Sequence, residues 1–247
     1  MKGLSNTFPE DKTPLSGINY LDIHDNYALA DQFGTEDFDG RLAVDEDLYK
    51  IAVTLLYTSV GPIVTHGGSE IMRSKAGAPL MEVVKETNAG FKIYMHGKRD
   101  TYNHRMANQF IWETVGAGPE GDNKNDYKSM HAFWQGMNAF RLSDYGKVFR
   151  VSEAVPEGYI QWITPDQESM LGYIVDEKIF VLLNAGDKQN TFNGVTLPEG
   201  NWKLIATNEK VDHLKGVKDK FNKSKLKGGS SMDISVQPES LRIWVRE

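Results

Sequence analysis

The segment from residue 17 to residue 33, GINYLDIHDNYALADQF, constrains the fold of this chain more than any other stretch. Its apolar side chains have the pattern of a buried strand: Ile18, Tyr20, Leu21 and Ile23. The run ends abruptly in the polar triplet His24-Asp25-Asn26. Taken alone, this triplet is also typical of a turn or a helix cap. In a barrel of parallel strands, however, polar residues at the carboxyl end of a strand project into the barrel mouth, where site chemistry is found.

The residues that follow predict a helix and then a second strand. Asp45 is a suitable helix cap, and the apolar positions behind it recur with helical spacing: Leu48, Ile51, Ala52, Leu55 and Leu56. Gly61 and Pro62 end this segment, and the short apolar run 63–65 leads into the polar sequence HGGSEIMRSK. The order of strand, helix and strand, with polar residues after each strand, predicts a βα unit that feeds a second parallel strand.

These residues resemble the α-amylase superfamily of glycoside hydrolases, and within it most closely the pullulanase-type debranching enzymes. The family pattern NYxxxHDNxxLxD is matched by Asn19, Tyr20, His24, Asp25, Asn26, Leu29 and Asp31. The pattern GIPFxHxGxExxRSK is matched, with the proline displaced by one position, by Gly61, His66, Gly68, Glu70, Arg73, Ser74 and Lys75. Farther on, YNHRMANQFIW is similar to SYNxxDxxNxxxW, and YKSMHAFWQGMNAFR is similar to the helix that closes the family's barrel. The four matches occur in the family's order.

The resemblance implies that residues 1–147 hold the last two βα units of a (β/α)8 (TIM) barrel. In the family, an aspartate nucleophile follows the fourth strand and a glutamate acid/base follows the fifth, whereas His24 and Asp25 correspond to the end of the seventh. We therefore expect the carboxyl-terminal part of a retaining glycoside hydrolase that acts on starch, glycogen or pullulan through α-1,4 or α-1,6 linkages. Because both catalytic carboxylates would lie upstream, the chain by itself is expected to be inactive.

The resemblance assigns His24 and Asp25 to transition-state support in the central sugar subsite, and neither is the nucleophile. Asn26 can reach a neighbouring sugar hydroxyl or simply close a turn. Arg73 and Lys75 either bind glycan or brace the barrel mouth, and His66 fits a hydrogen-bonded structural role. Tyr102 and Asn103 are further candidate substrate-binding residues. The family's aspartate after the Asn of this motif is absent here, so the sugar contacts on the leaving-group side are expected to differ from the family's. Residues 76–98 resemble an insertion, so the choice of substrate is expected to differ from pullulan debranching.

Aromatic residues in the same region are candidate platforms for sugar faces, although aromatic side chains also commonly fill cores. They are Tyr94, Tyr102 and Trp112.

Residues 148–247 read differently, as short β-rich runs separated by turn formers. The runs are GYIQWI, LGYIVDEKIFVLLNAG, GNWKLIATN and MDISVQPESLRIWV. This spacing predicts a carboxyl-terminal antiparallel β-sandwich. Its expected core consists of Ile160, Trp162, Ile174, Phe180, Leu182, Trp202, Leu204, Ile243 and Val245.

Composition narrows the classes of partner. The formal net charge of −6 argues against a general nucleic-acid surface, and the interrupted basic stretch 210–227 reads as a solvated loop or hairpin. No run of 18 apolar residues exists, so no membrane partner is expected. No cofactor and no metal are predicted, because the chain has no cysteine and because His96 and His104 lack a third ligand at recognisable spacing. The lack of cysteine is compatible with the cytoplasm and with secreted or periplasmic bacterial proteins.

The sequence leaves two alternatives to part of a glycoside hydrolase. His66-Gly67-Gly68-Ser69 mimics an esterase oxyanion loop, but the nucleophile motif GxSxG occurs nowhere in the chain. A non-catalytic α-glucan-binding or accessory module remains the serious alternative. Two barrel strands on their own would also leave apolar edges uncovered, at Ile18, Leu55 and Ile63, so self-association through these edges is a further expectation.

Overall fold

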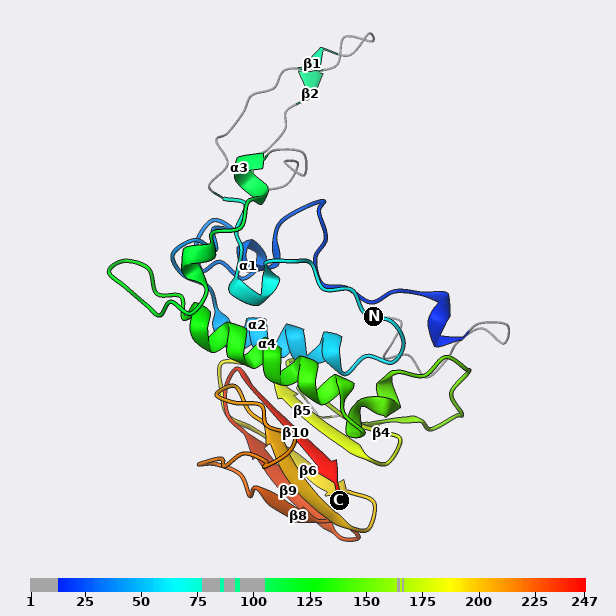
Figure 1. The fold of residues 1–247 in the computed structure, drawn as a ribbon. Coiled ribbons are helices and arrows are strands. Elements are labelled where there is room, and N and C mark those ends of the chain that lie inside the picture. The colour runs from blue at the N-terminus through cyan, green and yellow to red at the C-terminus, as the bar shows by residue number, and fades with distance from the viewer. Residues whose placement is uncertain (1–12, 77–84, 87–91, 94–104, 164, 166) are drawn as a thin grey trace. The chain divides into compact units, whose positions relative to one another are not determined.

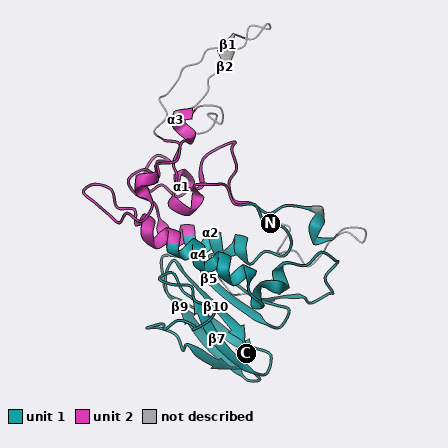
Figure 2. Ribbon diagram, in the orientation of Figure 1, with its two compact units in different colours: residues 1–19, 50–64, 132–247 teal, residues 20–49, 65–131 magenta. Residues whose placement is uncertain are grey.

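The structure is a computed structural model that describes residues 13–76, 85–86, 92–93, 105–163, 165 and 167–247 (Figure 1). Its contacts divide the chain into two compact units (Figure 2). Unit 1 comprises residues 1–19, 50–64 and 132–247, and unit 2 comprises residues 20–49 and 65–131. The boundary expected between residues 147 and 148 falls inside unit 1, within the short 3-10 helix η5 (Tyr145–Phe149), and stays a prediction.

Unit 1 contains two antiparallel sheets. The larger has the strand order β3 (Ile160–Ile163), β4 (Met170–Val175), β5 (Ile179–Asn184), β10 (Ser240–Arg246), β7 (Asn201–Ala206) and β8 (Lys225–Lys227). The smaller pairs β6 (Asn190–Thr196) with β9 (Ser231–Val236). The prediction of a carboxyl-terminal antiparallel β domain is confirmed. Strands β6 and β8 are additions to it, because no strand was predicted for residues 190–196 and only a loop or hairpin was predicted around β8.

The two sheets enclose one hydrophobic core. Phe180, Trp202 and Trp244 from the larger sheet lie in the same buried cluster as Phe192 and Ile234 from β6 and β9. Stacking of Phe180 on Trp244 at 5.2 Å, and edge contact of Phe180 with Trp202 at 6.3 Å, fill its centre. A fully buried aromatic or aliphatic side chain stabilises the fold by about 1.5–3 kcal/mol, so this core holds the domain together.

Strands β5 and β10 are buried on both faces, which explains their continuous apolar sequences. Helical segments of unit 1 lie on the side of the sheet away from β6 and β9 (Figure 1). There, Tyr173 of β4 and Thr58 share a hydrogen bond of 2.5 Å. Eight of the nine predicted core residues are buried. The prediction for Trp162 is wrong, because this residue lies on the edge strand β3 with 39% of its surface exposed. An edge strand has a neighbour on one side only, so its outward ring remains in contact with water.

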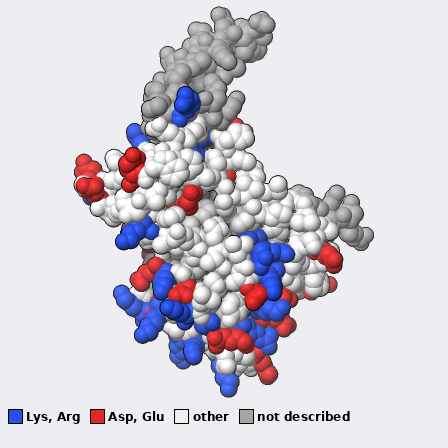
Figure 3. Space-filling model, in the orientation of Figure 1, with Lys and Arg blue, Asp and Glu red and all other residues white. Residues whose placement is uncertain are grey.

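The turns of unit 1 follow their sequence signals. Asp176 and Glu177 both adopt positive φ, 49° and 52°, in the three-residue connection 176–178 that joins β4 to β5, where the Lys178 amide donates to the Val175 oxygen at 3.0 Å. Positive φ at both central positions is the geometry that matches the twist of a tight hairpin. On the face drawn in Figure 3, acidic and basic side chains are interspersed over the strands of this domain, as on a solvated surface.

Two helices begin in unit 2 and continue into unit 1. Helix α2 (Glu46–Tyr57) begins where predicted, and the Asp45 carboxylate accepts a hydrogen bond from the Leu48 amide at 3.0 Å, which confirms the cap. Helix α4 (Tyr127–Leu142) is the predicted second long helix. Near its end, the Arg141 guanidinium donates to the backbone oxygens of Tyr57, Ser59 and Gly61. None of the helices in the described ranges combines the length and apolar character that crossing a membrane requires.

The two predicted barrel strands are reduced to a single parallel bridge between Asn19 and Ile63. Its hydrogen bonds run from the Asn19 amide to the Pro62 oxygen at 3.0 Å and from the Val64 amide to the Asn19 oxygen at 2.9 Å. The prediction of continuous strands at 17–23 and 63–65 is therefore wrong for this structure. A parallel ladder gains stability from neighbours on both sides, and within the described residues these two segments pair only with each other.

Unit 2 is built mainly from loops and short helices. In chain order its own elements are α1 (Leu29–Gln32), η3 (Ser69–Ile71), β1 (Lys85–Glu86), β2 (Lys92–Ile93), α3 (Arg105–Asn108) and η4 (Trp112–Thr114). Strands β1 and β2 pair antiparallel. Loops are where binding residues most often lie, and all of the residues singled out by the family patterns between His24 and Lys75 except Gly61 belong to this unit.

Candidate functional site

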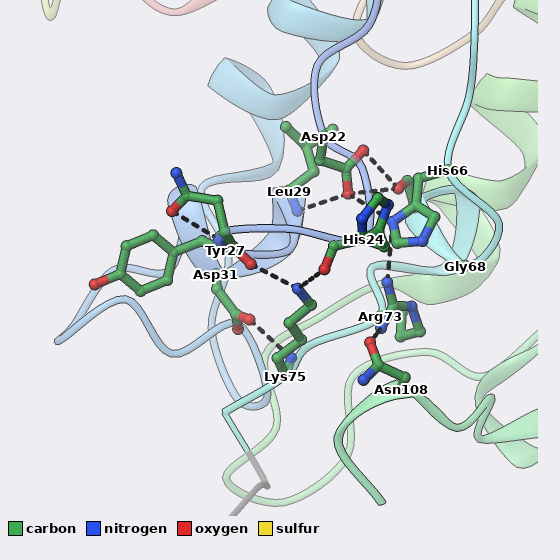
Figure 4. Close-up of polar contacts among 12 residues, drawn as sticks. Asp22, His24, Tyr27, Leu29, Asp31, His66, Gly68, Arg73, Lys75 and Asn108 are labelled. Carbon is green, nitrogen blue, oxygen red and sulfur yellow. Dashed lines mark hydrogen bonds and ion pairs between the residues drawn. The ribbon is translucent and has the colours of Figure 1, made fainter. Parts of the chain in front are cut away.

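The carboxylate of Asp22 joins two distant loops of unit 2 (Figure 4). Asp22 is buried and accepts a hydrogen bond from the Leu29 amide at 3.0 Å, and the Ser69 hydroxyl donates to both of its oxygens at 3.1 and 3.0 Å. Tyr49, which is also buried, donates its hydroxyl to the Ser69 backbone oxygen at 2.6 Å. These bonds hold the loop that contains the HDN triplet against the loop that contains HGGSE.

Lys75 holds the HDN loop through its backbone. The side chain of Lys75 is fully buried, and its ammonium donates to the backbone oxygens of His24 and Asn26, each at 2.6 Å (Figure 4). Burial lowers the pKa of Lys75, as does the nearby Arg73, whereas the carboxylate of Asp31 opposes this shift. Because the ammonium binds carbonyl groups, it fixes the backbone path of the loop.

His24 and Asp25 are the exposed part of this loop. Their side chains are 59% and 64% exposed, and His24 Nε2 lies 3.4 Å from an oxygen of Asp25. Asn26 is exposed as well, and it adopts the left-handed conformation, with φ of 66°, which asparagine tolerates better than most residues. Its side-chain oxygen accepts from the Tyr27 amide at 3.0 Å. The arrangement therefore presents a carboxylate and an imidazole to solvent on a braced backbone, while the amide of Asn26 shapes the turn.

A second buried carboxylate, Asp31, holds the segment on which Lys75 lies. It accepts hydrogen bonds from the Gly40 amide at 3.0 Å, from the Lys75 amide at 2.7 Å and from the Ser74 hydroxyl. Burial raises the pKa of Asp31, and the hydrogen bonds from Ser74, Gly40 and Lys75 offset part of that rise. All three donors come from the protein, so the Asp31 carboxylate has a structural role.

Arg73 supports the HGGSE loop. Its guanidinium contacts His66 Nδ1 at 3.1 Å and donates to the Asn108 side-chain oxygen at 3.4 Å. Since a guanidinium only donates, His66 Nδ1 accepts in this contact, and the same nitrogen lies 3.6 Å from an oxygen of Asp22. Burial lowers the pKa of Arg73, and the charge of Asp22 opposes that shift. Gly68 makes room for this arrangement: its φ is 97°, and a Cβ there would lie 2.8 Å from Arg73 Cδ.

The structure thus brings four of the predicted site residues, His24, Asp25, Asn26 and Arg73, into unit 2, the first three in one loop. Tyr102 and Asn103, like Tyr94, lie outside the described residues. His66 has the predicted hydrogen-bonded role, and the bonds of Lys75 favour bracing over sugar contact. Asp22 was missed as a site residue, although an acidic residue inside the apolar run INYLDI was a signal that this position needed a buried partner.

Comparison with known proteins supports the fold alone. No protein-family model and no curated protein matches the sequence. Among solved structures, the chain is similar to pullulanase from Bacillus acidopullulyticus, with 18% identity and a TM-score of 0.56 over 93% of this chain and 24% of that one. It is similar to the catalytic module of the glycogen-degrading pneumococcal virulence factor SpuA, with 17% identity and a TM-score of 0.61 over 95% of this chain and 36% of that one.

A third similar structure is the Group B Streptococcus pullulanase SAP in complex with maltotetraose, with 17% identity and a TM-score of 0.59 over 95% of this chain and 33% of that one. The chain therefore spans between 24% and 36% of the length of these three proteins. At these identities, the likeness shows that nearly all of the chain has a fold found within pullulanase-type enzymes.

Proposed function

We propose that this chain forms part of the substrate-binding site of an α-glucan-acting glycoside hydrolase of the pullulanase type. The observation that carries the proposal is the HDN loop, in which a buried lysine fixes two backbone oxygens while His24 and Asp25 are exposed. The shared fold, and the maltotetraose held by one of the similar pullulanases, support α-glucan as the ligand class. Starch, glycogen and pullulan, with α-1,4 or α-1,6 linkages, are the proposed substrates of the intact enzyme.

In this proposal Asp25 and His24 support the transition state. Glycoside cleavage develops positive charge on the sugar ring, and a preorganised carboxylate complements that charge as it forms. Asp25 supplies the carboxylate, and His24 supplies a directional hydrogen bond to a hydroxyl of the same ring. Asn26 reaches a neighbouring hydroxyl. Arg73 acts mainly by holding His66 and Asn108, and its direct contact with glycan stays a prediction, as do contacts from Tyr102 and Asn103.

The retaining mechanism needs a nucleophile and a general acid/base, and other carboxylates of the candidate site are unsuited to either role. Asp22 and Asp31 are buried and accept several hydrogen bonds from the protein. Glu70 accepts from the Gly68 amide at 2.8 Å. We therefore place the nucleophile and the acid/base in another part of a (β/α)8 barrel to which residues 1–147 belong, and the chain alone is expected to be inactive.

A non-catalytic α-glucan-binding module is the second candidate. The engagement of Asp22 and Asp31 favours it, because a module that only binds needs no carboxylate available for bond cleavage. The two candidates make the same prediction for binding, and they differ in whether Asp25 changes turnover in an enzyme that contains this chain.

The experiment measures maltotetraose affinity by isothermal titration calorimetry for the chain and for Asp25→Asn. The amide keeps the shape of the side chain and removes its charge, so affinity should fall about 3- to 10-fold, as for loss of a charged hydrogen-bonding group at an exposed site. Asp187→Asn, an exposed aspartate in unit 1, is the matched control and should bind as the unaltered chain does.

Two results would contradict the proposal. One is equal affinity for Asp25→Asn and the unaltered chain, and the other is no maltotetraose binding at all. A companion assay with starch, pullulan and nitrophenyl α-glucosides should detect no hydrolysis by the chain alone. Turnover that is abolished by a substitution within this chain would show that the catalytic carboxylates lie within it.

A further inference from the structure

A lysine-rich stretch runs along one edge of the larger sheet in unit 1. It consists of residues 213–227, which include β8 at the end of the strand order and are called the lysine strip below. The strip holds six lysines and one aspartate, a formal charge of +5, whereas the whole chain carries −6 and its remainder −11. The six lysines are all exposed: Lys215, Lys218, Lys220, Lys223, Lys225 and Lys227. One short segment therefore carries the opposite sign of charge from the rest of the chain.

The nearby aspartates do not neutralise these lysines. Asp219, within the strip, is buried and lies 2.5 Å from the Arg242 guanidinium, and Asp212 lies 3.3 Å from the Lys210 ammonium. Among the residues that the structure describes, no carboxylate forms an ion pair with a lysine of the strip. The positive charge of the strip is therefore available to an anionic partner.

Two bulky apolar side chains also project from the strip. Leu214 is 76% exposed, more than any other large apolar side chain in the described ranges, and Phe221 is 62% exposed. The two loops that contain them leave the sheet at the same residue of β7, Leu204. Its oxygen accepts from the Val217 amide at 2.9 Å, and its amide donates to the Ser224 oxygen at 2.8 Å. The strip thus combines apolar loop tips with lysines in neighbouring loops.

Hydrogen bonds hold both loops in shape. The Asp212 carboxylate accepts from the Lys215 amide at 2.9 Å, and the Asp219 carboxylate accepts from the Phe221 amide at 3.2 Å. A surface that is ordered before binding loses less conformational freedom when a partner covers it.

The composition of the strip favours an anionic lipid surface over a nucleic acid. Arginine, which is the better residue for bidentate phosphate and nucleic-acid recognition, is absent from residues 213–227. Lysine side chains extend along apolar surface and keep their ammonium groups in the polar layer, while exposed apolar side chains enter the layer beneath the headgroups. Binding of this kind needs no long apolar segment, so the lack of an 18-residue apolar run does not bear on it.

Protection of a sheet edge explains only part of this pattern. Lysine on an edge strand hinders pairing with another sheet, which accounts for Lys225 and Lys227 of β8. The other four lysines lie outside β8, as do Leu214 and Phe221. A binding role accounts for the lysines and for the apolar tips together.

We propose that the lysine strip is a docking surface for lipid membranes with anionic headgroups. The lysines attract the protein to the headgroups, and Leu214 and Phe221 enter the membrane interface. The proposal does not rest on the proposed function, because the strip belongs to unit 1 and the HDN loop belongs to unit 2.

Vesicle flotation of the full chain tests the proposal. The assay compares vesicles of phosphatidylcholine alone with vesicles that also contain about 30% phosphatidylglycerol, an anionic lipid. The chain should bind the anionic vesicles and leave the neutral ones unbound. Binding should weaken when the salt concentration is raised from about 0.1 M to about 0.5 M, because salt screens exposed charges.

Two triple variants separate the strip from general charge. Lys218→Gln/Lys220→Gln/Lys223→Gln should weaken binding to the anionic vesicles about tenfold or more. The matched control removes the same charge from exposed lysines outside the strip and should bind as the unaltered chain does: Lys124→Gln/Lys128→Gln/Lys188→Gln.

Entry of the apolar tip into the membrane has its own readout. The chain has no cysteine, so Phe221→Cys provides a single site for an environment-sensitive fluorophore. Emission of the label should shift to the blue on anionic vesicles. A label at Asp187→Cys, an exposed position outside the strip, should show no shift.

Four results would overturn the proposal. The first is a lack of binding of the unaltered chain to anionic vesicles, and the second is equal binding by the two triple variants. The third is vesicle binding without a shift of the label at Phe221→Cys, which would mean that the strip contacts charge alone. The fourth is tighter binding to single-stranded DNA than to anionic vesicles, which would assign the strip to nucleic acid.

Discussion

Replacing Lys75 by methionine tests how the HDN loop is held. Methionine keeps most of the length of the buried side chain and removes the ammonium that donates to the His24 and Asn26 oxygens, each at 2.6 Å. The substitution therefore removes two hydrogen bonds and a buried charge, and it leaves the exposed residues of the loop unaltered.

The expected loss of stability follows from these bonds. A hydrogen bond to a charged group contributes about 1.5–3 kcal/mol, so two contribute about 3–6 kcal/mol. Part of this is offset, because burial of the ammonium is itself unfavourable, as the lowered pKa of Lys75 indicates, and because water can reach the carbonyl groups of an opened loop. We expect a net decrease of about 2–3 kcal/mol in the free energy of unfolding.

Two measurements check this prediction. Urea denaturation gives the free energy of unfolding, and hydrogen exchange followed by mass spectrometry gives the local opening of residues 20–33. Lys75→Met should lower the first and accelerate exchange in that segment, and it should also weaken maltotetraose binding. Lys188→Met, at an exposed lysine of unit 1, should change none of the three. Unaltered stability and unaltered exchange in Lys75→Met would refute the bracing role of the ammonium.

Three further predictions concern Gly68, Asp31 and the carboxyl-terminal β domain. Gly68→Ala should destabilise the chain by about 2 kcal/mol or more in urea denaturation, because φ is 97° and the new Cβ would meet Arg73, whereas Gly118→Ala, which meets nothing within 4 Å, should cost little. Burial raises the pKa of Asp31 from 3.8, so its protonation contributes stability that is present below pH 3.8 and is lost as the pH rises through the raised folded-state value. Denaturation at a series of pH values should show this loss in the unaltered chain, and its presence in Asp31→Asn would assign it to another group. Residues 148–247 should unfold cooperatively with a β-type circular dichroism spectrum, and a helical spectrum would contradict the expected domain boundary.

Local sequence signals were sufficient for helix α2 and for much of unit 1. The Asp45 cap, the helical spacing behind it and the Asp176-Glu177 turn each act over a few residues, and each is present where predicted. Strand β6 was missed for a physical reason. Its register shifts between Phe192 and Val195, so its buried side chains do not alternate regularly, and its partner strand β9 is some forty residues farther along the chain.

The candidate site could be predicted only in part. The exposed residues His24 and Asp25 were identified from their position after an apolar run and from the family pattern. The contacts that hold them were not, because Lys75 binds backbone oxygens, which every residue has, and Asp22 binds Ser69, which is 47 positions away. Pairings of this kind depend on the folded path of the chain, and no local pattern encodes them.

The central claim is that the HDN loop of this chain binds α-glucan. Backbone amide chemical shifts, followed by nuclear magnetic resonance during titration with maltotetraose, test it most directly. The account predicts saturable shift changes at His24, Asp25 and Asn26, and their loss in Lys75→Met. Saturation of the protein with maltotetraose without a shift change at these three amides would contradict it.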